Sequence, residues 1–254
     1  MGYYDLTVEE RKQIFSKMQA DIEAAFHSKE FPVLTKYFSD EDTYIRRNAA
    51  LITGRLALSK KGLKSNIDFC LKILLSSENH KVRQTAVICL GELGKTLAGV
   101  FDDLGSMLED PHHSVRNAVI GAIKQMGDKN PAPAFKFVLR NINSPNPAIR
   151  REMVHGIELR GRKHPEEVLP ILAEMQFEKD RSVKKMIVHV IGQISYKKGS
   201  LEKVLDALAA WDNKDLVRIA LAEILKTHKN YEKFSDKSSA EAEKIIRERF
   251  PGWV

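Results

Sequence analysis

A β-branched apolar residue followed directly by a basic residue recurs along the chain at nearly constant spacing. Successive basic members of this pair lie 37, 33, 34, 34 and 34 positions apart. The pairs are Ile45-Arg46, Val82-Arg83, Val115-Arg116, Ile149-Arg150, Val183-Lys184 and Val217-Arg218. A fixed period of this length predicts a chain of stacked supersecondary units instead of one irregular core.

The residues that follow each pair keep the apolar spacing of one helical face. In four repeats, positions 4, 7 and 11 beyond the β-branched residue are apolar, as expected for an α-helix with one buried side. These series are Ile45/Ala49/Ile52/Leu56, Val82/Ala86/Cys89/Leu93, Val115/Val119/Ala122/Met126 and Val183/Ile187/Val190/Ile194. The fourth and sixth repeats end in polar residues and read Ile149/Met153/Gly156/Arg160 and Val217/Leu221/Ile224/His228. Each repeat is therefore expected to contain one long helix that buries this face.

A polar residue that can accept hydrogen bonds precedes each β-branched residue by five positions. These residues are Asp40, Ser77, Asp110, Ser144, Glu178 and Asp212. Because such side chains bind the free N–H groups of a first helical turn, they are predicted to be helix N-caps. Shorter apolar segments lie between the long helices, at 67–75, 97–108, 134–139, 168–175 and 201–208. Each repeat is thus predicted to be a pair of helices.

This arrangement resembles the HEAT-repeat family over residues 30–228. The resemblance implies an all-α fold, a right-handed α-α superhelix of about six helix pairs closed by capping helices. A capping box that begins at Thr7 predicts an N-terminal capping helix within 1–29, and one that begins at Ser238 predicts a C-terminal helix within 229–254, after a linker. We expect residues 1–254 to form a single solenoid domain.

The basic residues of the six pairs form a column, called here the basic column. Each lies one residue, about 100°, from the buried face of its helix, in the direction of the neighbouring repeat. In the HEAT family such arginines typically pair with turn aspartates of adjacent repeats. The resemblance therefore implies that the basic column is a structural ladder.

A further set of positions, 2, 6, 9 and 13 residues beyond each β-branched residue, lies opposite the buried face. The resemblance to HEAT folds implies that this stripe faces a concave groove. The stripe becomes basic in repeats four and five, which read Arg151/His155/Glu158/Arg162 and Lys185/His189/Gly192/Tyr196. The candidate nucleic-acid contacts are Arg47, Lys124, Arg151, His155, Arg162, Lys185, His189 and Tyr196.

The formal net charge of +7 is concentrated in the middle of the chain, where residues 31–230 carry 32 basic and 23 acidic residues. Rows of Lys and Arg suit phosphate-backbone binding because each neutralised phosphate releases counterions. We therefore expect a nucleic-acid partner, DNA in preference to RNA. The alternative is a scaffold that binds an acidic or helical protein segment in the same groove, with Leu51, Leu58 and Ile88 as an apolar patch.

Two segments are similar to the DNA alkylation repair HEAT-like glycosylases. They are 115–138, which begins Val-Arg-Asn-Ala, and 44–50, in which an Arg-Arg pair precedes Asn and Ala. That family removes alkylated bases with aromatic residues and a carboxylate in a basic groove, so the resemblance implies a relation to DNA repair. Here Trp211 and Trp253 fall outside the groove, and Glu158 and Asp128 are the best-placed carboxylates. No catalytic residue is predicted, and a glycosylase is the minority alternative.

The sequence carries no motif for a cofactor, such as a Gly-rich phosphate loop or a nucleophile elbow. His155 and His189 are expected to be stacked neighbours, but no clear carboxylate or cysteine set accompanies them, so no metal is predicted. Cys70 and Cys89 lie in apolar helical patterns as buried thiols. With no apolar run long enough for a membrane span, these features favour a cytoplasmic protein.

Overall fold

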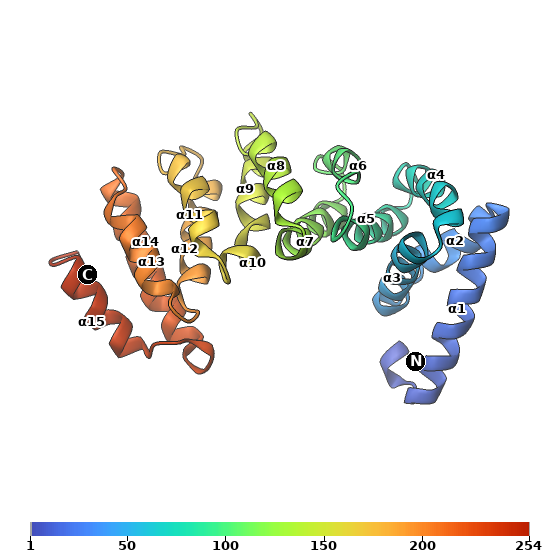
Figure 1. Cartoon of the computed structure of the whole chain (residues 1–254), viewed down its shortest axis with the longest axis horizontal. Coiled ribbons are helices and arrows are strands. Elements are labelled where there is room, and N and C mark those ends of the chain that lie inside the picture. Colours follow the sequence, from blue (N-terminus) through green and yellow to red (C-terminus); the bar gives the residue numbers. More distant parts are fainter. Residues whose placement is uncertain (1, 254) are drawn as a thin grey trace. The chain divides into compact units, whose positions relative to one another are not determined.

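The computed structural model describes residues 2–253, which fold into helices joined by short turns. The chain divides into two compact units, Met1–Asn130 (unit 1) and Pro131–Val254 (unit 2). Each unit is a stack of helix pairs, and in every pair except α8–α9 the first helix is the shorter one (Figure 1). No strand occurs among residues 2–253. The expected all-α architecture of paired helices is therefore confirmed.

Unit 1 begins with a capping helix and continues with three pairs, α2–α3, α4–α5 and α6–α7. Its elements are η1 Tyr3–Asp5, α1 Val8–Ser28, α2 Phe31–Phe38, α3 Thr43–Ser59, η2 Lys61–Leu63, α4 Lys64–Leu75, α5 His80–Gly94, α6 Phe101–Ser106 and α7 His113–Lys129. The long helices α3, α5 and α7 pack successively against one another. In Figure 1, α5 and α7 lie below α4 and α6, so long and short helices form two layers.

Unit 2 repeats the pairing and ends with a short helix. Its elements are α8 Pro131–Asn141, α9 Pro147–Gly156, α10 Glu158–Gly161, α11 Pro165–Glu174, α12 Arg181–Ser195, α13 Ser200–Ala209, α14 Lys214–Asn230, η3 Glu232–Phe234 and α15 Ser239–Arg249. The long helix α12 packs between α9 and α14. The long helix of the fourth repeat is broken into α9 and α10, at the place where the apolar series ends in Gly156 and Arg160.

Capping boxes open the first and last α-helices as predicted. The Thr7 hydroxyl accepts a hydrogen bond from the Glu10 amide, and the Ser238 hydroxyl accepts one from the Glu241 amide. In both cases the glutamate side chain accepts a hydrogen bond from the backbone of its cap residue. Each box satisfies two backbone N–H groups that the helix itself leaves without partners.

The N-caps of the long helices differ from the prediction. The observed caps lie one or two residues later, at Asp42, Asn79, His112, Asn146, Asp180 and Asn213. Five of the six predicted caps instead accept a hydrogen bond from the backbone amide two residues ahead, as Asp110 does from His112 and Ser144 from Asn146. Five of the six turns thus carry two acceptors two residues apart, one that shapes the turn and one that caps the helix.

The predicted apolar face forms the core of both units. The series of repeats two, three and five are entirely buried, with exposed fractions of 0–4%. In the first repeat, Ile45 is only half-buried, and the sixth repeat buries His228 completely at its last position. Cys70 and Cys89 are buried free thiols, as predicted. No helix within the described part of the chain has the length and apolar character needed to cross a membrane.

Candidate nucleic-acid interface

Two arginines of the basic column form the expected ladder with an acid of the next turn. Nε and Nη2 of Arg83 donate to the two carboxylate oxygens of Asp110 at 2.7 and 2.9 Å. Arg150 makes the same bidentate contact with Glu178, also at 2.7 and 2.9 Å. The Asp110 side chain is 3% exposed and the Glu178 side chain 8%. These contacts therefore tie adjacent repeats together within each unit.

The pairing also sets the ionisation of the two carboxylates. Burial alone would raise the pKa of Asp110, but the hydrogen bonds from Arg83 and from the His112 amide lower it overall. The hydrogen bonds from Arg150 hold the pKa of Glu178 below its ordinary value, although partial burial opposes them. Both groups are thus ionised near neutral pH and neutralise the arginines they bind.

The other residues of the basic column have different surroundings. Nη1 of Arg46 donates to the Asp40 carbonyl and Nη1 of Arg116 to the Asp110 carbonyl, each at 2.6 Å and within its own repeat. Lys184 and Arg218 are exposed. The turn that follows Arg46 offers Ser77 in place of an acid, so the bidentate pair cannot form there. The ladder expected for the whole column is confirmed only at Arg83 and Arg150.

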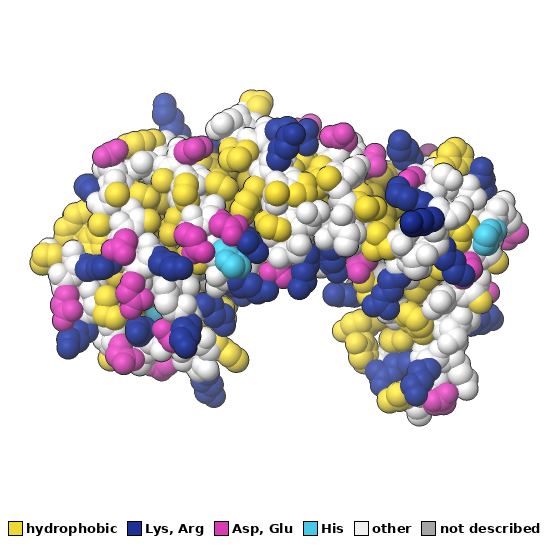
Figure 2. Space-filling model, in the orientation of Figure 1, with side chains coloured by type: hydrophobic (Ala, Val, Ile, Leu, Met, Phe, Trp, Pro, Cys, Tyr) yellow, Lys and Arg dark blue, Asp and Glu magenta, His cyan; other side chains and the backbone are white. Residues whose placement is uncertain are grey.

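In unit 1 the stripe positions of successive long helices do share one face. A small cavity of about 180 Å³ is lined by stripe residues of α3, α5 and α7, among them Arg47, Leu51, Ile88 and Gly121. Gly91 permits the close packing of this face, because a Cβ there would lie 2.8 Å from the Ala122 Cβ. Arg47 is exposed and Lys124 is half-buried. Figure 2 shows Lys and Arg side chains below α5 and α7, beside apolar ones.

A larger cavity near the start of unit 1 combines aromatic and basic side chains. It measures about 880 Å³ and is lined by residues that include Tyr3, Tyr4, Tyr44, Arg11 and Arg47. The Tyr4 and Tyr44 rings meet edge to face with centroids 4.1 Å apart, and the Arg11 guanidinium lies 5.3 Å from the Tyr4 ring centroid. Arg47 was a predicted contact of the stripe, whereas the tyrosines were not predicted, because they come from different segments of the chain.

In unit 2, stripe residues of α12 and α14 and their neighbours form a basic surface with an apolar floor, called here the α12–α14 surface. Its residues are Arg181, Lys184, Lys185, Val188, His189, Leu216, Ile219, Glu223 and Lys226, which line a cavity of about 570 Å³. Lys226 pairs with Glu223 at 3.2 Å. Arg181, Lys184 and Lys185 are exposed, and none of them makes an ion pair with an acid in residues 2–253. This surface therefore carries uncompensated positive charge.

Only Lys185 and His189 of this surface were among the predicted contacts. The stripe count in the sixth repeat gives Ile219, Glu223 and Lys226, so the period of the sequence carries the signal for these three residues. Lys184 occupies the ladder position of its repeat, as Arg83 does in the second repeat.

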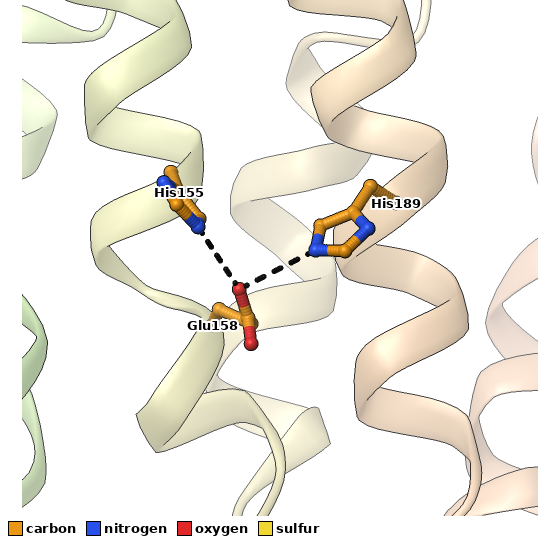
Figure 3. Close-up of side chains that lie close together, drawn as sticks. All are labelled: His155, Glu158 and His189. Atoms are coloured by element: carbon orange, nitrogen blue, oxygen red, sulfur yellow. Dashed lines mark ion pairs between the residues drawn. The ribbon is translucent and has the colours of Figure 1, made fainter. Parts of the chain in front are cut away.

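Three predicted contacts, His155 and Arg162 of the fourth repeat and His189 of the fifth, lie around one buried carboxylate. Figure 3 shows the two histidines beside it. Glu158 opens α10 with its side chain only 6% exposed, and its Oε1 accepts a hydrogen bond from Nη2 of Arg162 at 2.5 Å. His155 of α9 and His189 of α12 both direct Nε2 toward its other oxygen. The structure thus confirms that the two histidines are neighbours, but their rings lie edge to face with centroids 6.2 Å apart and are not stacked, and Glu158 contacts both.

Tyr196 and Arg151 are less able to contact a ligand than the sequence predicted. Tyr196 is only 3% exposed, because its ring stacks on Tyr231 with centroids 5.3 Å apart. The expectation that Tyr196 faces the groove is therefore corrected. Arg151 remains half-exposed, but its Nη1 donates to Glu152 at 2.6 Å, so its charge is partly compensated.

Comparison with known proteins gives structural likenesses. No curated protein matches the sequence. Among solved structures, the protein smu.31 from Streptococcus mutans UA159 is similar, with 18% identity, 82% of this chain and 96% of that chain covered, and a TM-score of 0.48. AlkD2 from Streptococcus mutans has 20% identity, coverage of 89% and 99%, and a TM-score of 0.47. A designed armadillo repeat protein has 15% identity, coverage of 79% and 100%, and a TM-score of 0.35.

The family assignment comes from the sequence profile of HEAT repeats. This profile matches residues 67–141 and 136–226, which together span more than half of the chain. The matched region contains the Arg83–Asp110 and Arg150–Glu178 pairs and the long helices from α5 to α12. The chain therefore belongs to the HEAT-repeat family.

Proposed function

We propose that this protein binds the phosphate backbone of duplex DNA, with the α12–α14 surface as its principal contact. The observation that carries the proposal is the absence of acidic partners for Arg181, Lys184 and Lys185 among the described residues. Side chains of this kind can neutralise phosphates and release condensed counterions, whereas ladder arginines are already neutralised. Because phosphate contacts carry no sequence information, binding tolerates changes of base sequence.

The remaining predicted residues take secondary places in this proposal. Arg47 and Lys124 would be separate candidate contacts of unit 1, and Arg151 a weaker one of unit 2, whereas Arg162 is already paired with Glu158. His155 and His189 lie beside Glu158 and would add secondary contacts. Tyr196 is no longer included, because its buried ring cannot reach a ligand.

The test is fluorescence anisotropy of a labelled duplex of about 20 base pairs at low salt. The variant Lys184→Glu with Lys185→Glu should bind at least about tenfold more weakly than the natural chain, because two phosphate contacts become repulsive. The matched control, Lys72→Glu with Lys136→Glu, changes the net charge equally on two exposed lysines of α4 and α8. It should change the affinity by less than about threefold, the effect of net charge alone. Equal losses in both variants, or no binding by the natural chain, would contradict the proposal.

A second candidate, binding of an acidic amphipathic peptide, is favoured by the apolar floor of the same surface. Val188 and Leu216 lie under the cavity, and the Ile219 side chain is 57% exposed. A peptide with acidic and apolar faces would cover both features, whereas a phosphate backbone needs only the charges. The variant Ile219→Ser separates the two candidates. It should leave DNA affinity unchanged if the proposed function holds, and it should weaken capture of a labelled acidic peptide if the second candidate holds.

A further inference from the structure

His155, Glu158 and His189 of unit 2 bring two imidazole rings to one carboxylate, an arrangement that phosphate binding does not require. Nε2 of His155 lies 3.3 Å from Oε2 of Glu158, and Nε2 of His189 lies 3.7 Å from the same oxygen. One potential ligand atom from each residue lies within 4.8 Å of the other two. Figure 3 shows the two imidazole rings reaching this oxygen from α9 and α12.

These separations fit a transition-metal site. Zn²⁺ binds imidazole nitrogen at about 2.0–2.1 Å and carboxylate oxygen at about 2.0–2.2 Å, so neighbouring ligand atoms of a tetrahedral site lie about 3.4 Å apart. The observed 3.3 and 3.7 Å are close to this spacing. Two imidazoles and one carboxylate are also a donor set that zinc takes when three protein ligands leave one position open.

Surrounding groups hold the carboxylate in the orientation that such a site needs. Nη2 of Arg162 donates to Oε1 of Glu158 and to Oε1 of Gln193, each at 2.5 Å. Because Arg162 engages Oε1, the other oxygen remains directed toward the histidines. Hydrogen bonds of this kind orient metal ligands in known sites. Glu158 is 6% exposed and His189 is 42% exposed, so the side of the cluster away from Glu158 is open to solvent.

We propose that His155, Glu158 and His189 bind one Zn²⁺ ion, with a solvent-facing fourth position for water. No metal was predicted from the sequence, because no clear carboxylate or cysteine set accompanied the two histidines; in the structure Glu158 supplies the carboxylate. The inference does not depend on the proposed function, because Arg181, Lys184 and Lys185 are not ligands.

The test is calorimetric titration of ZnCl₂ into the untagged, metal-free full chain near pH 7.5. The expected result is one ion per chain, with an affinity that falls at least about 100-fold in His189→Ala, since even outer-shell changes cost about 10–100-fold. His189 is half-exposed, so this variant should fold normally. The matched control is His27→Ala, which removes an exposed histidine of α1 in unit 1.

A second measurement reads the geometry directly. Co²⁺ added in place of Zn²⁺ should give the intense visible absorption of a tetrahedral centre, and His189→Ala should lose it while His27→Ala keeps it. The proposal is overturned if the natural chain binds no Zn²⁺, if His189→Ala binds it equally well, or if His27→Ala removes the binding.

Discussion

Arg83 and Lys184 occupy the same position of the repeat and have opposite surroundings. Arg83 is partly buried and makes a bidentate pair with Asp110 of the next turn, whereas Lys184 is exposed. The turn after Lys184 also carries an acid, Asp212, but no ion pair joins the two. The shorter reach and single charged group of lysine suit the bidentate contact poorly.

The difference shows that a basic residue at a given repeat position has no fixed role. A fork-shaped guanidinium opposite a buried carboxylate becomes part of the framework and adds little to the external field. An exposed lysine at the same position adds its full charge to the surface. The net charge of +7 therefore does not show where positive charge is available for binding. Arg83 and Arg150 are neutralised by their carboxylates, whereas Arg181 and the two lysines of α12 make no ion pair with an acid among the described residues.

The largest expected effect is the loss of a ladder carboxylate. Asp110→Ala should lower the free energy of unfolding by about 3 kcal/mol, because Arg83 is left partly buried without its partner. The equivalent change at the exposed Asp212, Asp212→Ala, should stay within about 0.5 kcal/mol. Urea unfolding followed by circular dichroism measures both. Similar losses of stability in Asp110→Ala and Asp212→Ala would show that the Arg83–Asp110 pair does not stabilise the fold.

Lowering the pH should weaken the stabilisation by the Arg150–Glu178 pair, with a smaller effect on the free energy of unfolding than Asp110→Ala. The pKa of Glu178 is held below its ordinary value of 4.5, chiefly by hydrogen bonds from Arg150. Its stabilising contribution is therefore present above pH 4.5 and lost as the pH falls through the lowered value. Glu178→Gln should be less stable than the natural chain at pH 7, and the difference should shrink in acid. The check is urea unfolding from pH 7 to pH 3; parallel stability curves would rule out this linkage.

The smallest expected effect on stability belongs to Lys184. Lys184→Ala removes an exposed charge that makes no ion pair among residues 2–253, so the free energy of unfolding should change by less than about 0.5 kcal/mol. The same variant should weaken DNA binding, because one phosphate contact is lost. Thermal unfolding and anisotropy on the same preparation give both quantities. A clear loss of stability would mean that Lys184 stabilises the packing of adjacent repeats, as Arg83 does.

The paired-helix fold could be predicted because every repeat carries its own signal. The series from Val183 to Ile194 is fully buried, as its spacing implies. The helix starts were misplaced by one or two residues, because each turn contains two residues able to cap and the sequence does not say which one does. The break between α9 and α10 was visible only as the irregular series that ends in Gly156 and Arg160.

The site could be predicted only where it follows the repeat period. Lys185 and His189 were found by counting along a helix, and Ile219 and Lys226 obey the same count. The burial of Tyr196 depends on Tyr231, which follows the end of α14 and packs back by tertiary contact. The convergence of His155, His189 and Glu158 combines two repeats with a helix break, so no spacing within one repeat could reveal it.

The central claim is that uncompensated charge on the α12–α14 surface binds DNA, and its most direct test is the salt dependence of binding. The logarithm of the affinity should fall linearly with the logarithm of salt concentration, by about 0.9 per phosphate contact. Replacing Arg181, Lys184 and Lys185 together by Ala should make this slope shallower by about 3, one for each lost contact. A slope identical to that of the natural chain would contradict the claim.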